Sequence, residues 1–287
     1  MHKILVLAVK GGTGKSTVTA GLGKALAAKG LRVGLMDLDI SGANLPAALG
    51  MSEPFPHPEV DLTTQKLHPV CYAGCEIFSL AFRYGSSAVL KGGGDRTVTA
   101  FGETHLLKGT GRVELVKQMI NNVAFSELDY LLFDLPPSTG DEVLSLFEEV
   151  NDIHGCILVC QPTNLAVEDM VRALDMIEEK RLPLLGMVGN MVEAICPHCG
   201  EKYYPFTAPG VDLPNFCKEK GIPYLMGMPM TPVRPVLDEC LVRLAETIQV
   251  QVPVKIWDKG FKSRLERGIL HQMIKVVIRE QLHGGKD

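Results

Sequence analysis

The sequence predicts an α/β protein with a doubly wound, mostly parallel β-sheet flanked by helices and with a C-terminal helical extension. The first observation is a set of short segments that are apolar on both faces, as strands buried in a parallel sheet are. They span residues 4–9, 32–37, 76–82, 130–134, 156–160, 184–190 and 224–228. The second is that amphipathic segments alternate with them, at 16–29, 111–122, 142–151, 166–179, 211–220 and 233–248. This alternation favours helices on both faces of one sheet.

Composition is that of an ordinary globular protein and excludes some classes of function. The chain has 287 residues, of which 46% are hydrophobic and 22% charged, and its formal net charge is −4. That charge gives no reason to expect a nucleic-acid partner. No apolar run approaches the length of about 18 residues that a membrane span needs, so membrane association is not expected.

The apolar start of the chain runs directly into a glycine-rich loop and is interpreted as a buried strand rather than an export signal. We therefore expect a cytoplasmic protein whose cysteines are reduced. Cysteines stand at positions 71, 75, 156, 160, 196, 199, 217 and 240. Of these, Cys156, Cys160, Cys217 and Cys240 lie in apolar strands or helices and are expected to be ordinary buried thiols.

We divide the chain into a main α/β domain at 1–250 and an amphipathic helical extension at 251–287. Within the domain, 83–110 is expected to be a surface excursion, and 190–206 a loop that carries two cysteines. The extension is basic, with eight Lys/Arg against three acids between 255 and 286. We favour packing on its own domain or across a dimer; docking on a partner or on a membrane are the alternatives.

A glycine-rich loop follows the first strand and opens the first helix, which is the context that a phosphate-binding loop requires. It consists of Lys10-Gly11-Gly12-Thr13-Gly14-Lys15-Ser16-Thr17. Glycines let the backbone wrap so that its N–H groups point at the phosphates, and the helix N-terminus favours the same anions. We expect Lys15 to reach the β- and γ-phosphates and Ser16 to ligate Mg²⁺.

Acidic residues end two other predicted strands. Asp37 and Asp39 follow the second strand, and Asp134 closes the strand at 130–134. Carboxylates at the carboxyl ends of parallel strands face the ligand crevice. Asp134 is therefore predicted to hold Mg²⁺ through water, as a Walker-B carboxylate does.

Lys10 resembles the signature lysine of the deviant Walker-A ATPases, the group that includes MinD, ParA, nitrogenase iron protein and the Mrp-type carriers. The resemblance implies a homodimer in which Lys10 reaches the partner's phosphates. It also implies that Asp39 positions the attacking water, that Asp37 belongs to the Mg²⁺ shell, and that Asn190 and the loop at Pro229 hold adenine. The chain has no guanine-reading Asn-Lys-x-Asp sequence, so ATP is favoured over GTP.

A Cys-x-x-Cys pair follows Asn190, at Cys196 and Cys199. One such pair supplies two thiolates, whereas a zinc ion or a 4Fe–4S cluster usually takes four ligands. A two-fold dimer provides four across its axis. A zinc knuckle and a metal-free redox pair are the alternatives. Cys71 and Cys75 either complete this site or are unrelated to it, and we favour the second.

Two segments narrow the resemblance to the Mrp/ApbC iron–sulfur carrier ATPases, over residues 3–245. They are Asn190-Met191 with Cys196-Pro197-His198-Cys199-Gly200, and Asp134-Leu135-Pro136-Pro137-Ser138-Thr139-Gly140-Asp141. The resemblance implies a slowly hydrolysing, ATP-binding homodimer that carries a 4Fe–4S cluster between Cys196 and Cys199 and delivers it to apo iron–sulfur client proteins or assembly factors. Ser41-Gly42-Ala43-Asn44 departs from the family's Tyr-Gly-Pro-Ser.

Three other functions remain open. A MinD/ParA-like positioning ATPase fits the nucleotide motifs but gives the cysteine pair no task. A nickel or zinc insertion chaperone keeps the cysteines and loads a different ion. An ATP-sensing scaffold is the non-catalytic alternative.

Overall fold

The computed structural model describes residues 1–40, 42–84, 97–98, 104–105, 109–137, 141–196, 198–231 and 234–257. The predicted C-terminal extension lies outside these residues from position 258 onward, as does most of the predicted surface excursion at 83–110.

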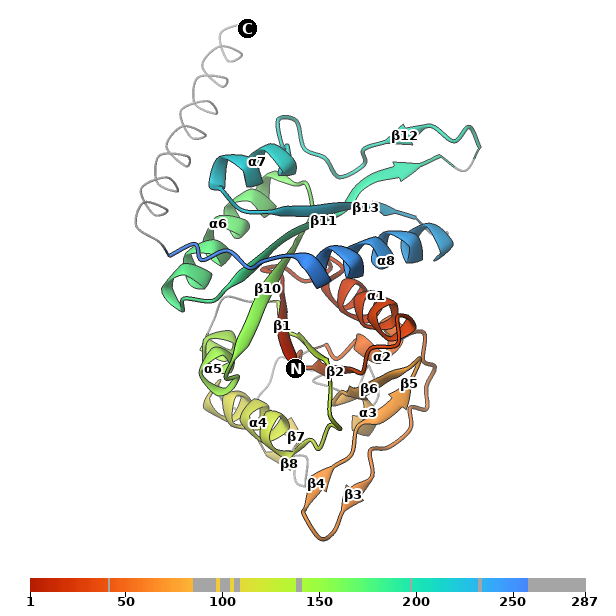
Figure 1. Ribbon diagram of the computed structural model, residues 1–287, viewed down its shortest axis with the longest axis vertical. Coiled ribbons are helices and arrows are strands. Elements are labelled where there is room, and N and C mark those ends of the chain that lie inside the picture. Colours follow the sequence, from red (N-terminus) through yellow and green to blue (C-terminus); the bar gives the residue numbers. More distant parts are fainter. Residues whose placement is uncertain are drawn as a thin grey trace, which may run out of the picture.

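A nine-stranded, mostly parallel sheet forms the centre of the molecule (Figure 1). Its strand order is β12-β11-β10-β1-β9-β2-β6-β5, with β13 also paired to β11. The parallel strands are β1 (His2–Leu7), β2 (Val33–Asp37), β6 (Cys75–Phe78), β9 (Tyr130–Asp134), β10 (Ile153–Cys160), β11 (Leu184–Ile195) and β13 (Tyr224–Met230). All seven predicted strands are therefore present, and the α/β class is confirmed.

Helices cover both faces of the sheet, and each face has its own apolar core. One face packs against α4 (Gly109–Asn122), α5 (Asp141–Glu149), α6 (Asn164–Glu179) and α7 (Leu213–Lys220). The other packs against α1 (Lys15–Ala28) and α8 (Arg234–Val250). Successive residues of β1 alternate between the two cores: Leu5 and Leu7 lie in the first, Ile4 and Val6 in the second. A strand buried on both faces explains the unbroken apolar runs of the sequence.

Several elements were not predicted from the sequence. The short antiparallel strands β5 (Val70–Tyr72) and β12 (Lys202–Tyr203) pair with the sheet at its two ends. A separate hairpin joins β3 (Val60–Asp61) and β4 (Lys66–Leu67), and another joins β7 (Thr97–Val98) and β8 (Thr104–His105). Two short helices, α2 (Leu45–Leu49) and α3 (Ala81–Tyr84), follow β2 and β6. Elements of two to five residues are too short for a hydrophobic period to register.

Strand β11 continues five residues beyond the predicted end at Asn190 and forms a hairpin with β12. This hairpin projects from the upper right of the molecule in Figure 1, away from the helical layers. Among the described residues, no helix is both long and apolar enough to cross a membrane.

Leu132 tests the importance of the central strands, because it is fully buried in β9 between β1 and β2. Truncation to alanine removes apolar contacts and leaves a cavity, so we expect Leu132→Ala to lower the free energy of unfolding by about 2–5 kcal/mol. Urea titration followed by circular dichroism measures this change. Leu62→Ala is the matched control, since Leu62 is 88% exposed; an equal loss in both variants would contradict the assignment of the core.

Candidate functional site

The glycine-rich loop lies between β1 and α1, where its backbone needs glycine at two positions. Gly12 and Gly14 have φ angles of 78° and 85°, in the left-handed region that favours glycine. Gly14 is also the N-cap of α1. A Cβ atom on Gly14 would lie 2.1 Å from Nδ2 of Asn190. The loop and β11 therefore approach each other too closely for any side chain at this position.

Asp134 ends β9 and is completely buried, and three donors from α1 reach its carboxylate. Lys15 Nζ lies 2.7 Å from Oδ1, Thr19 Oγ1 lies 3.0 Å from Oδ1, and Ser16 Oγ lies 2.6 Å from Oδ2. A buried carboxylate is tolerated only when it is paired and hydrogen-bonded. These contacts join the start of α1 to the carboxyl end of β9.

Asp37 ends the neighbouring strand β2, directly opposite Asp134 in the parallel register. Its carboxylate accepts hydrogen bonds from the Asp39 N–H at 3.1 Å, the Leu45 N–H at 3.2 Å and the Ser79 hydroxyl at 2.9 Å. Burial, followed by the repulsion of Asp134, raises the pKa of Asp37 to about 8.

This pair of carboxylates matches the chemistry of a magnesium site. Asp37, Asp134 and the Ser16 hydroxyl present oxygen ligands, which Mg²⁺ prefers. Two buried like charges repel each other, and a divalent cation between them removes that repulsion. The donor set therefore fits the predicted ion.

Asp39 lies just beyond β2 and is 8% exposed. Its Oδ1 accepts the Gly42 N–H at 3.0 Å, so the side chain closes the turn that leads into α2. Because the Asp39 N–H also donates to the Asp37 carboxylate, the two acidic residues are joined by a hydrogen bond.

Lys10 forms an ion pair within its own chain. Its Nζ lies 3.1 Å from Oδ2 of Asp169 on α6, a side chain that is 9% exposed and also lies 3.5 Å from Arg172. The contact is electrostatic, because that oxygen has no aligned hydrogen-bond donor. Lys10 itself is 46% exposed. Lys10, which was predicted to act on the partner subunit, is thus paired with a residue of its own chain.

Of the residues predicted to hold the base, Asn190 contacts the phosphate loop. Asn190 is buried, and its Nδ2 donates to the Thr13 carbonyl at 2.7 Å. Pro229 is buried in β13, and Thr17 is exposed on α1. The structure therefore shows Asn190 bracing the phosphate loop, while a contact of Asn190 or Pro229 with adenine stays a prediction.

Cys196 and Cys199 lie at the tip of the β11–β12 hairpin. The turn is closed by hydrogen bonds from the Gly200 N–H to the Cys196 carbonyl and from the Cys196 N–H to the Glu201 carbonyl, both 2.9 Å. Backbone N–H groups of Cys199 and His198 donate to the Cys196 sulfur and lower the pKa of its thiol. The loop is therefore built to favour a thiolate, the form that binds metals.

The surroundings of this hairpin suit a shared site. In the described part of the chain, no three His, Cys, Asp or Glu side chains gather in a way that could hold a metal ion. Exposed apolar side chains flank the cysteines, namely Ile195, Tyr203, Tyr204 and Phe206. Each chain thus offers two thiols on an apolar projection.

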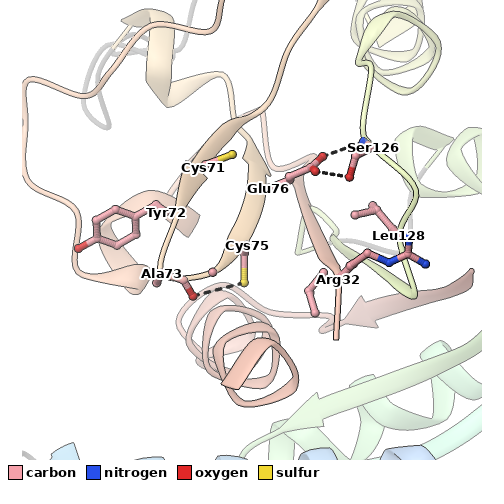
Figure 2. A pocket seen from close by; sticks show the side chains of 10 residues that line it. Arg32, Cys71, Tyr72, Ala73, Cys75, Glu76, Ser126 and Leu128 are labelled. Carbon is pink, nitrogen blue, oxygen red and sulfur yellow. Dashed lines mark hydrogen bonds between the residues drawn. The ribbon is translucent and has the colours of Figure 1, made fainter. Parts of the chain in front are cut away.

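Cys71 and Cys75 cannot act together as ligands in this arrangement. In the antiparallel β5–β6 pair, Cys71 lies opposite Glu76 while Cys75 lies opposite Tyr72. Cross-strand partners share a face, so the two thiols point to opposite faces of the sheet. Figure 2 shows Cys71 beside Glu76 and Cys75 turned the other way, around a cavity of about 380 Å³. Strand β5 also lies far from the β12 hairpin (Figure 1).

Most remaining cysteines are buried and unreactive. Cys156, Cys160 and Cys217 are buried as predicted, whereas Cys240 is only half-buried. Burial raises the pKa of the Cys75 and Cys217 thiols, to about 11 and about 12. These thiols stay protonated at neutral pH.

Comparison with known proteins decides the family. Residues 1–244 match the model of the NUBPL iron-transfer P-loop NTPases, a ParA family. The chain belongs to this family. It is 33% identical over 286 residues to the cytosolic Fe-S cluster assembly factor CFD1 of Eremothecium gossypii, covering 92% of this chain and 94% of the relative. It is 34% identical over 232 residues to the iron-sulfur cluster carrier protein of Methanocaldococcus jannaschii, covering 80% and 72%.

Solved structures have the same fold. The nucleotide-binding protein of Archaeoglobus fulgidus in complex with ADP matches with a TM-score of 0.61 and 27% identity, over 91% of both chains. The septum site-determining protein MinD of Pyrococcus horikoshii has a TM-score of 0.52 and 18% identity, over 87% and 96%, and shares the fold.

The structure brings Lys15, Ser16, Asp37 and Asp134 together, keeps Lys10 on the phosphate loop and places Asn190 of β11 against that loop. Sequence analysis missed four residues of the site: Thr19, Ser79, Gln161 and Asp169. Gln161 directly follows β10. A polar residue at the carboxyl end of a predicted strand indicates a candidate site residue, so sequence analysis could have found it. Ser79 directly follows β6 in the same way, but it falls within the strand predicted at 76–82. Thr19 and Asp169 sit inside helices, where no pattern marks them.

Cys196 gives a pH-dependent prediction. A lowered thiol pKa means a larger thiolate fraction at neutral pH, and the thiolate is the nucleophile. We expect the rate of Cys196 alkylation by iodoacetamide, followed by peptide mass spectrometry, to reach half its maximum at a lower pH in the native chain than in the urea-unfolded chain. Coincident profiles would show that the backbone N–H groups do not stabilise the thiolate.

Proposed function

We propose that this chain is an ATP-binding and slowly hydrolysing homodimer that carries a 4Fe–4S cluster between Cys196 and Cys199 of its two subunits. The cluster is cargo, delivered to apo iron–sulfur proteins or to assembly factors. The relatives described as cytosolic support a cytoplasmic location. The observation that carries the proposal is the pairing of a phosphate loop with an exposed two-cysteine hairpin in one iron-transfer family member.

The nucleotide half of the proposal rests on the charges around Asp134. Lys15 binds the β- and γ-phosphates, and the backbone N–H groups of residues 11–14 surround them. Ser16, Asp37 and Asp134 hold Mg²⁺, which supplies charge neutralisation for the leaving phosphate. Asp39 positions the attacking water, and Lys10 leaves Asp169 to reach the partner's phosphates.

The cargo half rests on ligand number. Two thiols in each chain leave a four-ligand cluster half satisfied, and a two-fold axis through the hairpins supplies the other two. The apolar side chains beside the cysteines provide contact area between the two subunits and keep water from the cluster. A low thiol pKa favours the ligating thiolate.

A nickel or zinc insertion chaperone is the second candidate, because the same thiolates also bind zinc. A positioning ATPase is disfavoured by the cysteine hairpin, for which that function has no use. The identity of the bound metal distinguishes the cluster carrier from the insertion chaperone.

Anaerobic reconstitution with iron and sulfide tests the cargo. We expect the wild-type chain to gain the absorbance and Mössbauer signature of one 4Fe–4S cluster per two chains, and Cys196→Ala to lose it, because the two thiolates that remain per site hold a cluster poorly. Cys71→Ala is the matched control, since Cys71 is exposed and lies on β5, at the opposite end of the strand order from β12. Stoichiometric zinc or nickel binding with no cluster would instead support the insertion chaperone.

Two lysines of the loop separate binding from turnover. Lys15→Ala removes a charge-assisted contact worth about 1.5–3 kcal/mol, so nucleotide affinity falls roughly ten- to hundredfold. Lys10→Ala keeps binding but lowers ATP turnover, because Lys10 acts on the partner's nucleotide. Fluorescent-nucleotide titration and phosphate release measure the two quantities, with circular dichroism to check folding. Normal turnover in Lys10→Ala would contradict the trans role.

A further inference from the structure

Two successive carbonyl groups of the phosphate loop are held from outside the loop. Gln161, directly after β10, donates from Nε2 to the Gly12 carbonyl at 3.2 Å. Asn190 of β11 donates from Nδ2 to the Thr13 carbonyl at 2.7 Å. A shift of the loop backbone therefore moves both side chains.

Both contacts lead to the same point of β11. Asn190 belongs to that strand, and the Gln161 nitrogen also lies 3.1 Å from the sulfur of the next residue, Met191. Thioether sulfur is a weak acceptor, so this contact is easily broken and re-formed. The phosphate loop is thus tied to two consecutive residues of one strand.

Strand β11 is irregular just beyond this point. Its pairing with β13 passes from Asn190 opposite Met228 to Ala194 opposite Met230, so β11 uses four residues where β13 uses two. Met191 has a φ of 57°, in the left-handed region that non-glycine residues seldom adopt. This is a bulge, which bends a strand and redirects the residues beyond it.

The cysteine hairpin lies directly beyond the bulge. Cys196 comes six residues after Asn190 and directly follows the last residue of β11, a span of about 20 Å at the rise of an extended chain. In Figure 1 β11 runs from the middle of the sheet out into this projection. A change in the bulge therefore swings the cysteines relative to the core.

We propose that Gln161 and Met191 are positioning residues that couple the phosphate loop to the cysteine hairpin, so that nucleotide sets the exposure of the Cys196 thiol. Its use in gating a cluster rests on the proposed function, whereas the coupling itself does not need a cluster. Neither residue touches the reacting phosphate in this scheme; both act through the backbone of the loop and the bulge.

The test uses the full-length chain without a cluster. Alkylation rates of Cys196 are measured with no nucleotide, with Mg–ADP and with a non-hydrolysable Mg–ATP analogue. We expect nucleotide to change the wild-type rate about fivefold, the lower range of allosteric coupling. Gln161→Met removes the donor but keeps the chain length, and we expect its rate ratio to fall to about one under saturating nucleotide.

A second variant and a matched control show whether the effect is specific to the proposed contacts. Met191→Leu keeps the Gln161 contact with the loop but removes the sulfur, and it should also lower the ratio. Gln118→Met makes the same substitution at an exposed site on α4, where the amide donates to Glu114 at 3.3 Å, one turn away on the same helix; it should keep the wild-type ratio.

The outcomes separate the coupling from the cargo. Unchanged nucleotide ratios in both Gln161→Met and Met191→Leu, or a wild-type rate that ignores bound nucleotide, overturn the coupling. Cluster reconstitution of the wild type is scored separately, so a chain that couples but loads no cluster overturns the proposed function alone.

Discussion

The buried carboxylate of Asp134 is the constraint on which the rest of the site depends. A charge with no exposure must be neutralised where it stands, and Lys15, Ser16 and Thr19 do so from one turn of α1. That requirement fixes the start of α1 over the end of β9. It also fixes the position of the phosphate loop, because the loop must connect β1 to α1 with only the few residues that lie between them. Asp37, one strand away, then faces Asp134 and makes the region favourable for a divalent cation.

Strand β11 is the second element on which the arrangement of the site depends. Most strands end at the crevice, whereas β11 passes the loop at Asn190, bulges at Met191 and continues to the cysteines. One covalent element therefore borders the phosphate loop and leads to Cys196 and Cys199. This chain belongs to a family of iron-transfer NTPases. A strand that joins the phosphate loop to the two cysteines explains how one domain can combine these two features.

Much of this arrangement was predictable because its signals are local. The buried strands show as apolar runs, and the glycine pattern with its lysines appears between a strand and a helix. Asp37 and Asp134 were identified because parallel strands end at one edge. Asp169 and Thr19 were not, since their roles arise only when α6 and α1 fold beside the loop. The opposite orientation of Cys71 and Cys75 also needed the hairpin register, which depends on the turn at Ala73-Gly74 rather than on cysteine spacing.

The cis ion pair of Lys10 with Asp169 has a consequence for assembly. In the proposed dimer, Lys10 exchanges one anionic partner for another, so the number of ionic contacts hardly changes when two chains meet. Such an exchange contributes little net attraction, and added salt weakens both sides of it alike. The free energy of association must then come from apolar surface, above all that around the cysteine hairpin. In the proposed dimer, subunit pairing is accordingly driven by apolar burial, and Lys10 contributes little to it.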